Sequence, residues 1–202
     1  MLSFIRFKSK EFISLISLYS VKSKSKRHLS QLQTKVIKIN NCIRYSIHES
    51  IHREEKELNR ILPAEIWNDG SRFWWRNDKE HRDDLDDNGK TLPAVIHSNG
   101  DQSWYKNGNM HRDDLDENGR VLPACIGNNG SQYWYKNGEC HRDDVDEKGR
   151  VLPAFIDIDG SQFWYTNGEL HRDDVDENGK TLPAIIYSEG SQEWWIDGVK
   201  QN

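Results

Sequence analysis

Acidic loops recur along the chain with the residue types and spacing that could bind a hard cation. The first is Asp84-Leu85-Asp86-Asp87-Asn88-Gly89, in which oxygen-bearing side chains alternate before a glycine. Oxygen ligands at the first, third and fifth positions are typical of the first half of a calcium loop. The candidate ligands are Asp84, Asp86, Asn88, Asp114, Asp116, Asn118, Asp174, Asp176 and Asn178.

Other features of these loops favour solvated turns. The twelfth position of a calcium loop holds an acid, whereas this chain has Val95 or Ile185 there, and the third loop has Lys148 at the fifth position. An aspartate can instead cap the bend, and Asn-Gly adopts positive φ angles readily. Two interpretations therefore stay open, acidic turns and divalent-cation (Ca²⁺) binding, and the sequence indicates no other cofactor.

A His-Arg-Asp-Asp motif precedes each loop, at His81, His111, His141 and His171. With Asn88, the first copy matches the H-R-D-x-x-x-x-N spacing of a protein-kinase catalytic loop. A kinase also needs a Gly-rich loop, a strand lysine and D-F-G, and the chain has none of these. Because the candidate residues are repeated rather than unique, we expect no enzymatic activity. The histidines are interpreted as part of a salt-bridge network, with a metal or pH-sensing stripe as the alternative.

A 30-residue unit sets this spacing and recurs without insertion or deletion from Leu62 to the C-terminus. Each unit begins with Leu-Pro-Ala, at Leu62, Leu92, Leu122, Leu152 and Leu182, and continues with a glycine and an aromatic pair. One unit cannot fold alone, because about five buried apolar side chains contribute roughly 10 kcal/mol. Ordering about thirty residues costs several times that amount. The units must therefore stack on one another.

Each unit is predicted to form three short β-strands. In the fourth unit these are residues 154–157, 162–165 and 169–173, with Asn167-Gly168 as a hairpin turn. The expected fold is all-β, an elongated antiparallel array of β-hairpin repeats. Because side chains alternate along a strand, the invariant Ala and Ile positions and the first Trp of each aromatic pair are predicted to form the packed face.

Two aromatic columns run through the units. The first, Trp74, Trp104, Trp134, Trp164 and Trp194, is assigned to the core. The second is the candidate surface for a protein partner: Trp75, Tyr105, Tyr135, Tyr165 and Trp195. Aromatic rings can also stack on nucleic-acid bases. However, residues 61–202 carry 15 Lys and Arg against 28 Asp and Glu, a net charge of −13, which opposes phosphate binding.

The repeat resembles a known class. Trp-Tyr-Lys-Asn-Gly-x-x-His-Arg followed by Pro-Ala-x-Ile-x-x-x-Gly-Ser is similar to a variant of the MORN-type repeat, as found in uncharacterised proteins of giant DNA viruses and some bacteria. The resemblance covers residues 62–202 and implies elongated hairpin arrays with scaffolding, protein-binding or membrane-proximal roles. The unit here is longer, and an Asp-rich loop replaces a tight Gly turn, so lipid binding is not carried over.

The first sixty residues differ from the array. Residues 1–40 form a basic extension with nine Lys and Arg against one acid. Its composition fits a mitochondrial-type presequence, a membrane-surface helix over Phe12 to Tyr19, a nuclear-localisation-like patch or a disordered leader. Residues 41–61 are predicted to form a degenerate capping repeat, in which residues 49–60 alternatively form a short helix.

The leading hypothesis is a non-enzymatic structural or interaction repeat protein that binds a protein partner. The alternatives are a Ca²⁺-responsive module and a membrane-proximal scaffold tethered by the basic N-terminus. End-to-end self-association is a further expectation, because the last unit is truncated. The three cysteines Cys42, Cys125 and Cys140 have no CxxC spacing, which favours a reducing, intracellular location over secretion.

Overall fold

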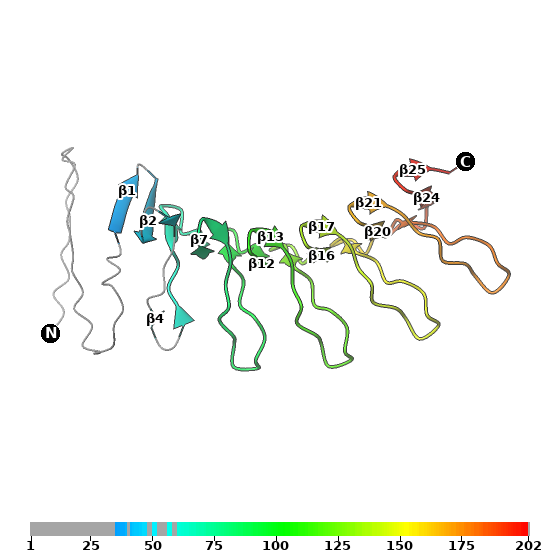
Figure 1. The fold of residues 1–202 in the computed structure, drawn as a ribbon. Helices are drawn as coiled ribbons and strands as arrows, with labels where there is room; N and C mark the ends of the chain where they lie inside the picture. The colour runs from blue at the N-terminus through cyan, green and yellow to red at the C-terminus, as the bar shows by residue number, and fades with distance from the viewer. Residues whose placement is uncertain (1–34, 40, 48–49, 52–55, 58–59, 202) are drawn as a thin grey trace.

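The computed structural model describes residues 35–39, 41–47, 50–51, 56–57 and 60–201. Every regular element in these ranges is a β-strand, so the predicted all-β array is confirmed. Successive units follow one another along a single axis (Figure 1). The helix expected over Phe12 to Tyr19 lies outside the described residues. No helix that is long and apolar enough to cross a membrane occurs within them.

One antiparallel sheet runs along the whole array, in the order β1-β2-β6-β7-β10-β11-β14-β15-β18-β19-β22-β23, with β3 paired to β2. Its strands are β1 (Lys35–Ile39), β2 (Cys42–Ile47), β3 (Ser50–Ile51), β6 (Glu65–Trp67), β7 (Arg72–Phe73), β10 (Val95–Ile96), β11 (Gln102–Ser103), β14 (Cys125–Ile126), β15 (Gln132–Tyr133), β18 (Phe155–Ile156), β19 (Gln162–Phe163), β22 (Ile185–Ile186) and β23 (Gln192–Glu193). From β6 onward each unit adds two strands, and the second pairs with the first strand of the next unit.

A two-stranded hairpin follows the sheet strands of each unit. The hairpin strands are β4 (Lys56–Glu57) with β5 (Arg60–Ile61), β8 (Trp75–Arg76) with β9 (Lys79–Glu80), β12 (Tyr105–Lys106) with β13 (Asn109–Met110), β16 (Tyr135–Lys136) with β17 (Glu139–Cys140), β20 (Tyr165–Thr166) with β21 (Glu169–Leu170), and β24 (Trp195–Ile196) with β25 (Val199–Lys200). At the tip of the third hairpin, Asn107 and Gly108 have φ angles of 54° and 87°, as a type I′ turn requires. The Gly108 amide then donates to the Glu80 carbonyl, 2.9 Å away, and so joins neighbouring hairpins.

The first Trp of each aromatic pair forms the corner between the sheet and the hairpin. The Trp164 amide donates to the Ala184 carbonyl in the next unit, whereas the Trp164 carbonyl accepts from the His171 amide across its own hairpin. The two backbone groups of one residue thus bond in different sheets. The predicted strand 162–165 is consequently wrong as a single element and is divided into β19 and β20.

The third predicted strand and the helix alternative also need correction. The third strand, expected over 169–173, ends at Leu170. Its partner strand stops at the corner residue Trp164, because the Trp164 amide bonds to the Ala184 carbonyl of the next unit and not across the hairpin. The helix alternative for residues 49–60 is wrong for the described positions there, which are β-strands. The sheet also begins at Lys35, before the expected boundary at residue 41.

The core is a stripe of alanine and tryptophan along the array. The Ala of each Leu-Pro-Ala motif is at most 1 % exposed, and Trp74, Trp104, Trp134 and Trp164 are buried. The prediction for the isoleucine column was wrong, because Ile66, Ile96, Ile126, Ile156 and Ile186 are only half-buried. The variable residue before each Ile faces the opposite side and is buried at Glu65, Val95 and Ile185.

Candidate functional site

Most of the invariant polar residues hold consecutive units together. The Trp134 indole donates through Nε1 to the Val121 carbonyl at 2.7 Å. The Arg142 guanidinium lies 3.9 Å from the centre of the same ring and donates through Nε to Asp144 at 2.8 Å. Asp144 also accepts from the Val121 amide of the preceding unit at 3.1 Å. The same arrangement recurs at Trp74, Trp104 and Trp164, so these residues serve the stacking of the array.

The aspartates predicted as first cation ligands belong to this network. Asp84, Asp114 and Asp174 each accept from the nearby Arg at 2.8–3.0 Å. Each also accepts from a backbone amide of the preceding unit. Their carboxylates are therefore already committed to neighbouring donors in the protein.

The other predicted cation ligands lie on the turns of the loops. Asp86 accepts through Oδ1 from the amides of Asn88 and Lys90, which closes the bend. Asp116 and Asp176 do the same with the amides of Asn118 and Asn178 and of the residues two positions further on. The described residues contain no cluster of three or more His, Cys, Asp or Glu that could hold a metal ion. Ca²⁺ binding by these loops stays a prediction.

The histidine column also connects consecutive units. His111 Nδ1 accepts from the amide of Asn137 in the next unit at 3.0 Å. Because a backbone amide only donates, the other ring nitrogen Nε2 carries the proton and donates to Asp113 at 2.7 Å. His81 and His141 make the equivalent contacts. The geometry agrees with the interpretation of this column as a polar network.

The aspartates that accept from these histidines should make the stability of the fold depend on pH. Asp113 accepts hydrogen bonds from Lys106 and from His111, and these hold the pKa of its carboxyl below the ordinary value. Hydrogen bonds from Lys136 and His141 lower the pKa of Asp143 in the same way. A carboxylate with a depressed folded-state pKa stabilises the fold above its unfolded pKa of about 3.9 and loses that contribution as the pH falls through the folded value. We expect the melting temperature, followed by Trp fluorescence, to fall between about pH 5 and pH 2. Asp113→Asn with Asp143→Asn should weaken this dependence, and a melting temperature that is constant over this range would contradict it.

A second set of side chains lies outside the Trp-Arg-Asp network and forms a continuous row along the sheet. In the register of the sheet, one residue of each strand from β6 to β23 lies opposite one residue of the next strand. We name this line of residues the axial row. Its members are Glu65, Phe73, Val95, Ser103, Cys125, Tyr133, Phe155, Phe163, Ile185 and Glu193. In the middle of the row Tyr133 stacks on Phe155 with ring centres 4.2 Å apart, and Phe155 stacks on Phe163 at 4.8 Å.

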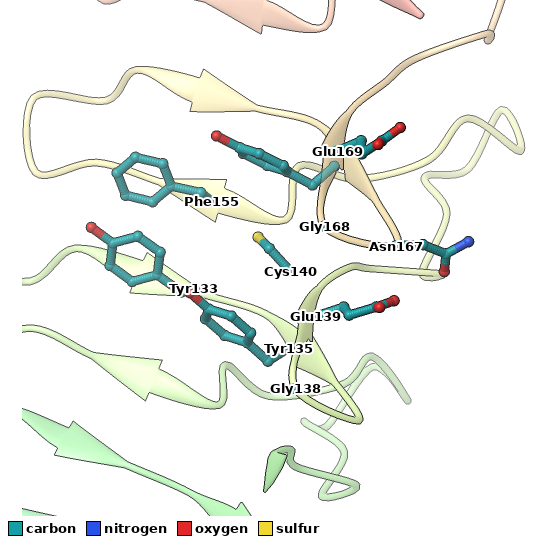
Figure 2. Close-up of a pocket in the computed structure, with 10 residues that line it drawn as sticks. Tyr133, Tyr135, Gly138, Glu139, Cys140, Phe155, Asn167, Gly168 and Glu169 are labelled. Atoms are coloured by element: carbon teal, nitrogen blue, oxygen red, sulfur yellow. The ribbon is translucent and has the colours of Figure 1, made fainter. Parts of the chain in front are cut away.

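The hairpins form the second wall beside the axial row. A groove of about 570 Å³ lies where Tyr133 and Phe155 of the sheet face the hairpin residues Tyr135, Cys140 and Tyr165. Figure 2 shows the Cys140 side chain between the rings, with Glu139 and Glu169 at the hairpin side and their carboxylates directed away from the rings. We name this feature the aromatic groove.

The predicted partner-binding column supplies this hairpin wall. Trp75, Tyr105, Tyr135, Tyr165 and Trp195 are all half-buried, and Tyr135 and Tyr165 line the aromatic groove. Burial raises the pKa of Tyr105, Tyr135 and Tyr165. The structure thus brings the middle of the column together with axial-row residues that the sequence interpretation missed.

Tyr133, at the centre of the groove, lacks the turn-side ring contacts that Phe73 has at the equivalent position of another unit. Phe73 contacts Trp67 and His97, with ring centres 6.0 and 5.8 Å away. The two positions equivalent to these beside Tyr133 are Gly127 and Asp157, so no ring covers Tyr133 from this side. Toward the C-terminus, cover returns where Phe163 contacts Tyr187 edge-on at 6.0 Å. The interruption of the aromatic position at Gly127 was the sequence signal that could have located the groove.

The cysteine inside the groove is not an activated nucleophile. Burial raises the pKa of Cys140 to about 12, so its thiol is protonated near neutral pH, and the thiolate is the reactive form. Cys42, Cys125 and Cys140 are all free thiols. The groove therefore offers contact surface rather than covalent chemistry.

Comparison with protein-family models and with curated proteins gives no match for this chain.

Proposed function

We propose that this chain is a non-enzymatic repeat protein that binds a segment of a protein partner in the aromatic groove. The observation that carries the proposal is the half-buried Tyr133 ring, which stacks on Phe155 in the groove but lacks the ring contacts from the turns that Phe73 and Phe163 have. Concave surfaces lined by aromatic side chains are typical of binding sites. The resemblance to MORN-type repeats, which implies protein binding and scaffolding, points in the same direction.

Two groups of residues have different uses in this proposal. The Trp-Arg-Asp network is the same in successive units because every junction between units needs it. The axial row changes from Ser103 to Tyr133 to Phe163 at equivalent positions, because these residues are not part of the Trp-Arg-Asp network. A rigid scaffold thereby presents a locally distinct contact surface, which is how repeat arrays commonly bind partners.

The test is a selection of peptides from a random displayed library against the full chain, followed by calorimetric titration of the selected peptides. Gly127→Trp should weaken their binding at least about tenfold. The new indole would contact Tyr133 as Trp67 contacts Phe73, and it would take the place of the peptide on that ring. A Cβ at this position would meet the Asn129 side-chain oxygen at 2.6 Å, which requires that side chain to rotate. Tyr133→Ala, which does not touch this turn, should weaken binding to a similar extent.

The control uses the exposed apolar residues of the loops, where Leu115 and Val145 are 44 % and 47 % exposed. Leu115→Ser with Val145→Ser should leave peptide binding unchanged if the aromatic groove is the binding surface. Binding that is lost with the loop variant and kept with Gly127→Trp and Tyr133→Ala would show that the proposed surface is wrong.

A further inference from the structure

The aromatic groove has acidic groups on both sides. Glu139 and Glu169 lie on the hairpins at one side (Figure 2). On the turn side, Asp157 lies beside Tyr133, and its negative charge adds to burial in raising the pKa of the Tyr133 hydroxyl. A negative potential therefore extends across the opening of an otherwise apolar groove.

Within the described residues, these acidic groups have no cationic partner. Asp157 accepts from the Ser131 hydroxyl at 2.7 Å and from the Ile158 amide. Neither Asp157, Glu139 nor Glu169 forms an ion pair with a Lys or Arg in the part of the chain that the structure describes. The hairpin lysines Lys106 and Lys136 already have acidic partners, since Lys106 pairs with Asp113 and Lys136 with Asp143. The uncompensated charge at the groove is available to a ligand.

The length of the axial row beside the groove limits the length of a ligand. The axial row crosses four neighbouring strands from Cys125 to Phe163, a distance of about 14 Å at roughly 4.8 Å per strand. An extended peptide covers that distance with about four or five residues at roughly 3.3 Å each. The groove therefore fits a short linear segment better than a folded domain.

Resting on the proposed function, we propose that the ligand is a short segment of a partner protein in which apolar side chains are flanked by lysine or arginine. The apolar side chains contact the rings of Tyr133, Phe155 and Tyr165. The flanking cations lie toward Asp157 on one side and Glu139 and Glu169 on the other. The acidic rims select against acidic segments and against nucleic acid, whose phosphates they repel.

Three synthetic peptides test the charge requirement. They share a Phe-Leu-Phe core and are flanked on each side by two lysines, two serines or two glutamates, and each is titrated into the full chain. We expect the lysine peptide to bind about tenfold more tightly than the serine peptide and the glutamate peptide to show no binding. The advantage of the lysine peptide should shrink as the salt concentration rises from about 0.05 to about 0.5 M.

Matched charge variants locate the effect. Glu139→Gln with Glu169→Gln should weaken binding of the lysine peptide about fivefold and leave the serine peptide unchanged. Glu117→Gln with Glu147→Gln removes the same charge from exposed loop positions and should change neither peptide. Gly127→Trp should abolish binding of the lysine peptide, which separates groove binding from a general attraction to the acidic array.

The outcomes distinguish this inference from the proposed function. Equal binding of all three peptides, with loss in Gly127→Trp, would retain the groove as a binding site and refute the basic ligand. Lysine-peptide binding that persists in Gly127→Trp would refute both. If the lysine peptide bound only after Lys22, Lys24 and Lys26 were replaced by serine, the chain's own basic segment would be the occupant, and the assignment to a partner would be wrong.

Discussion

Trp134→Ala is expected to lower the free energy of unfolding by about 3–5 kcal/mol, the range for removing a buried large aromatic side chain. The indole is 5 % exposed, donates to the Val121 carbonyl and lies under the Arg142 guanidinium. The substitution removes all three contributions and leaves a cavity at a junction between units. Urea unfolding of the full chain, followed by circular dichroism, measures the change.

Trp194→Ala is the matched control for this prediction. Trp194 occupies the same position in the last unit, but it is half-buried, and its nearest cation is Lys180 at 5.8 Å from the ring centre. The loss of stability should be less than half of that for Trp134→Ala. Equal losses for the two variants would show that the junction contacts are not what stabilises the array.

Asp144→Ala is expected to have an effect of similar size, about 3–5 kcal/mol, because it removes one partner of an ion pair whose side chains are only 8 % and 11 % exposed. Burial already lowers the pKa of Arg142, which reflects the cost of removing its charge from water. Without Asp144, the guanidinium loses its carboxylate and the Val121 amide loses its acceptor. The change is measured in the same urea unfolding experiment.

Asp146→Ala provides the comparison within the same loop. The Asp146 carboxylate accepts from Arg150 and from two turn amides, and these contacts lie near the surface. Its loss should lower the free energy of unfolding by clearly less than the loss of Asp144 does. A larger effect for Asp146→Ala than for Asp144→Ala would contradict the assignment of Asp144 to the junction.

Local features of the fold could be predicted from the sequence because they depend on local chemistry. Asn107-Gly108 specifies its turn through the positive φ angles that these residues tolerate. The invariant Ala of every unit and the first Trp of each pair except Trp194 are buried, as expected from their constant identity. The register of the repeat determines how all units are related, so one correct unit gives the rest of the array.

Features that depend on contacts between units could not be predicted. The division of residues 162–165 at Trp164 arises because one residue bonds to two sheets, which strand alternation does not reveal. Asp84 has the spacing of a cation ligand, but it accepts from an amide 23 residues earlier in the chain. The groove depends on Gly127, a residue without a side chain, at a position where three other units have a ring, at Trp67, His97 and Tyr187. Repeated residues do not mark the groove, because the groove arises where the repeat is interrupted.

The order of strands also determines how the array responds to force. Hydrogen bonds between neighbouring sheet strands point along the array axis, so tension applied at the two ends loads these bonds one after another rather than all at once. Each unit that peels away releases about 100 Å of extended chain in place of the roughly 10 Å that its two strands occupied. Stretching is thus expected to proceed at low force in unit-sized steps, which makes the folded array a compliant spring.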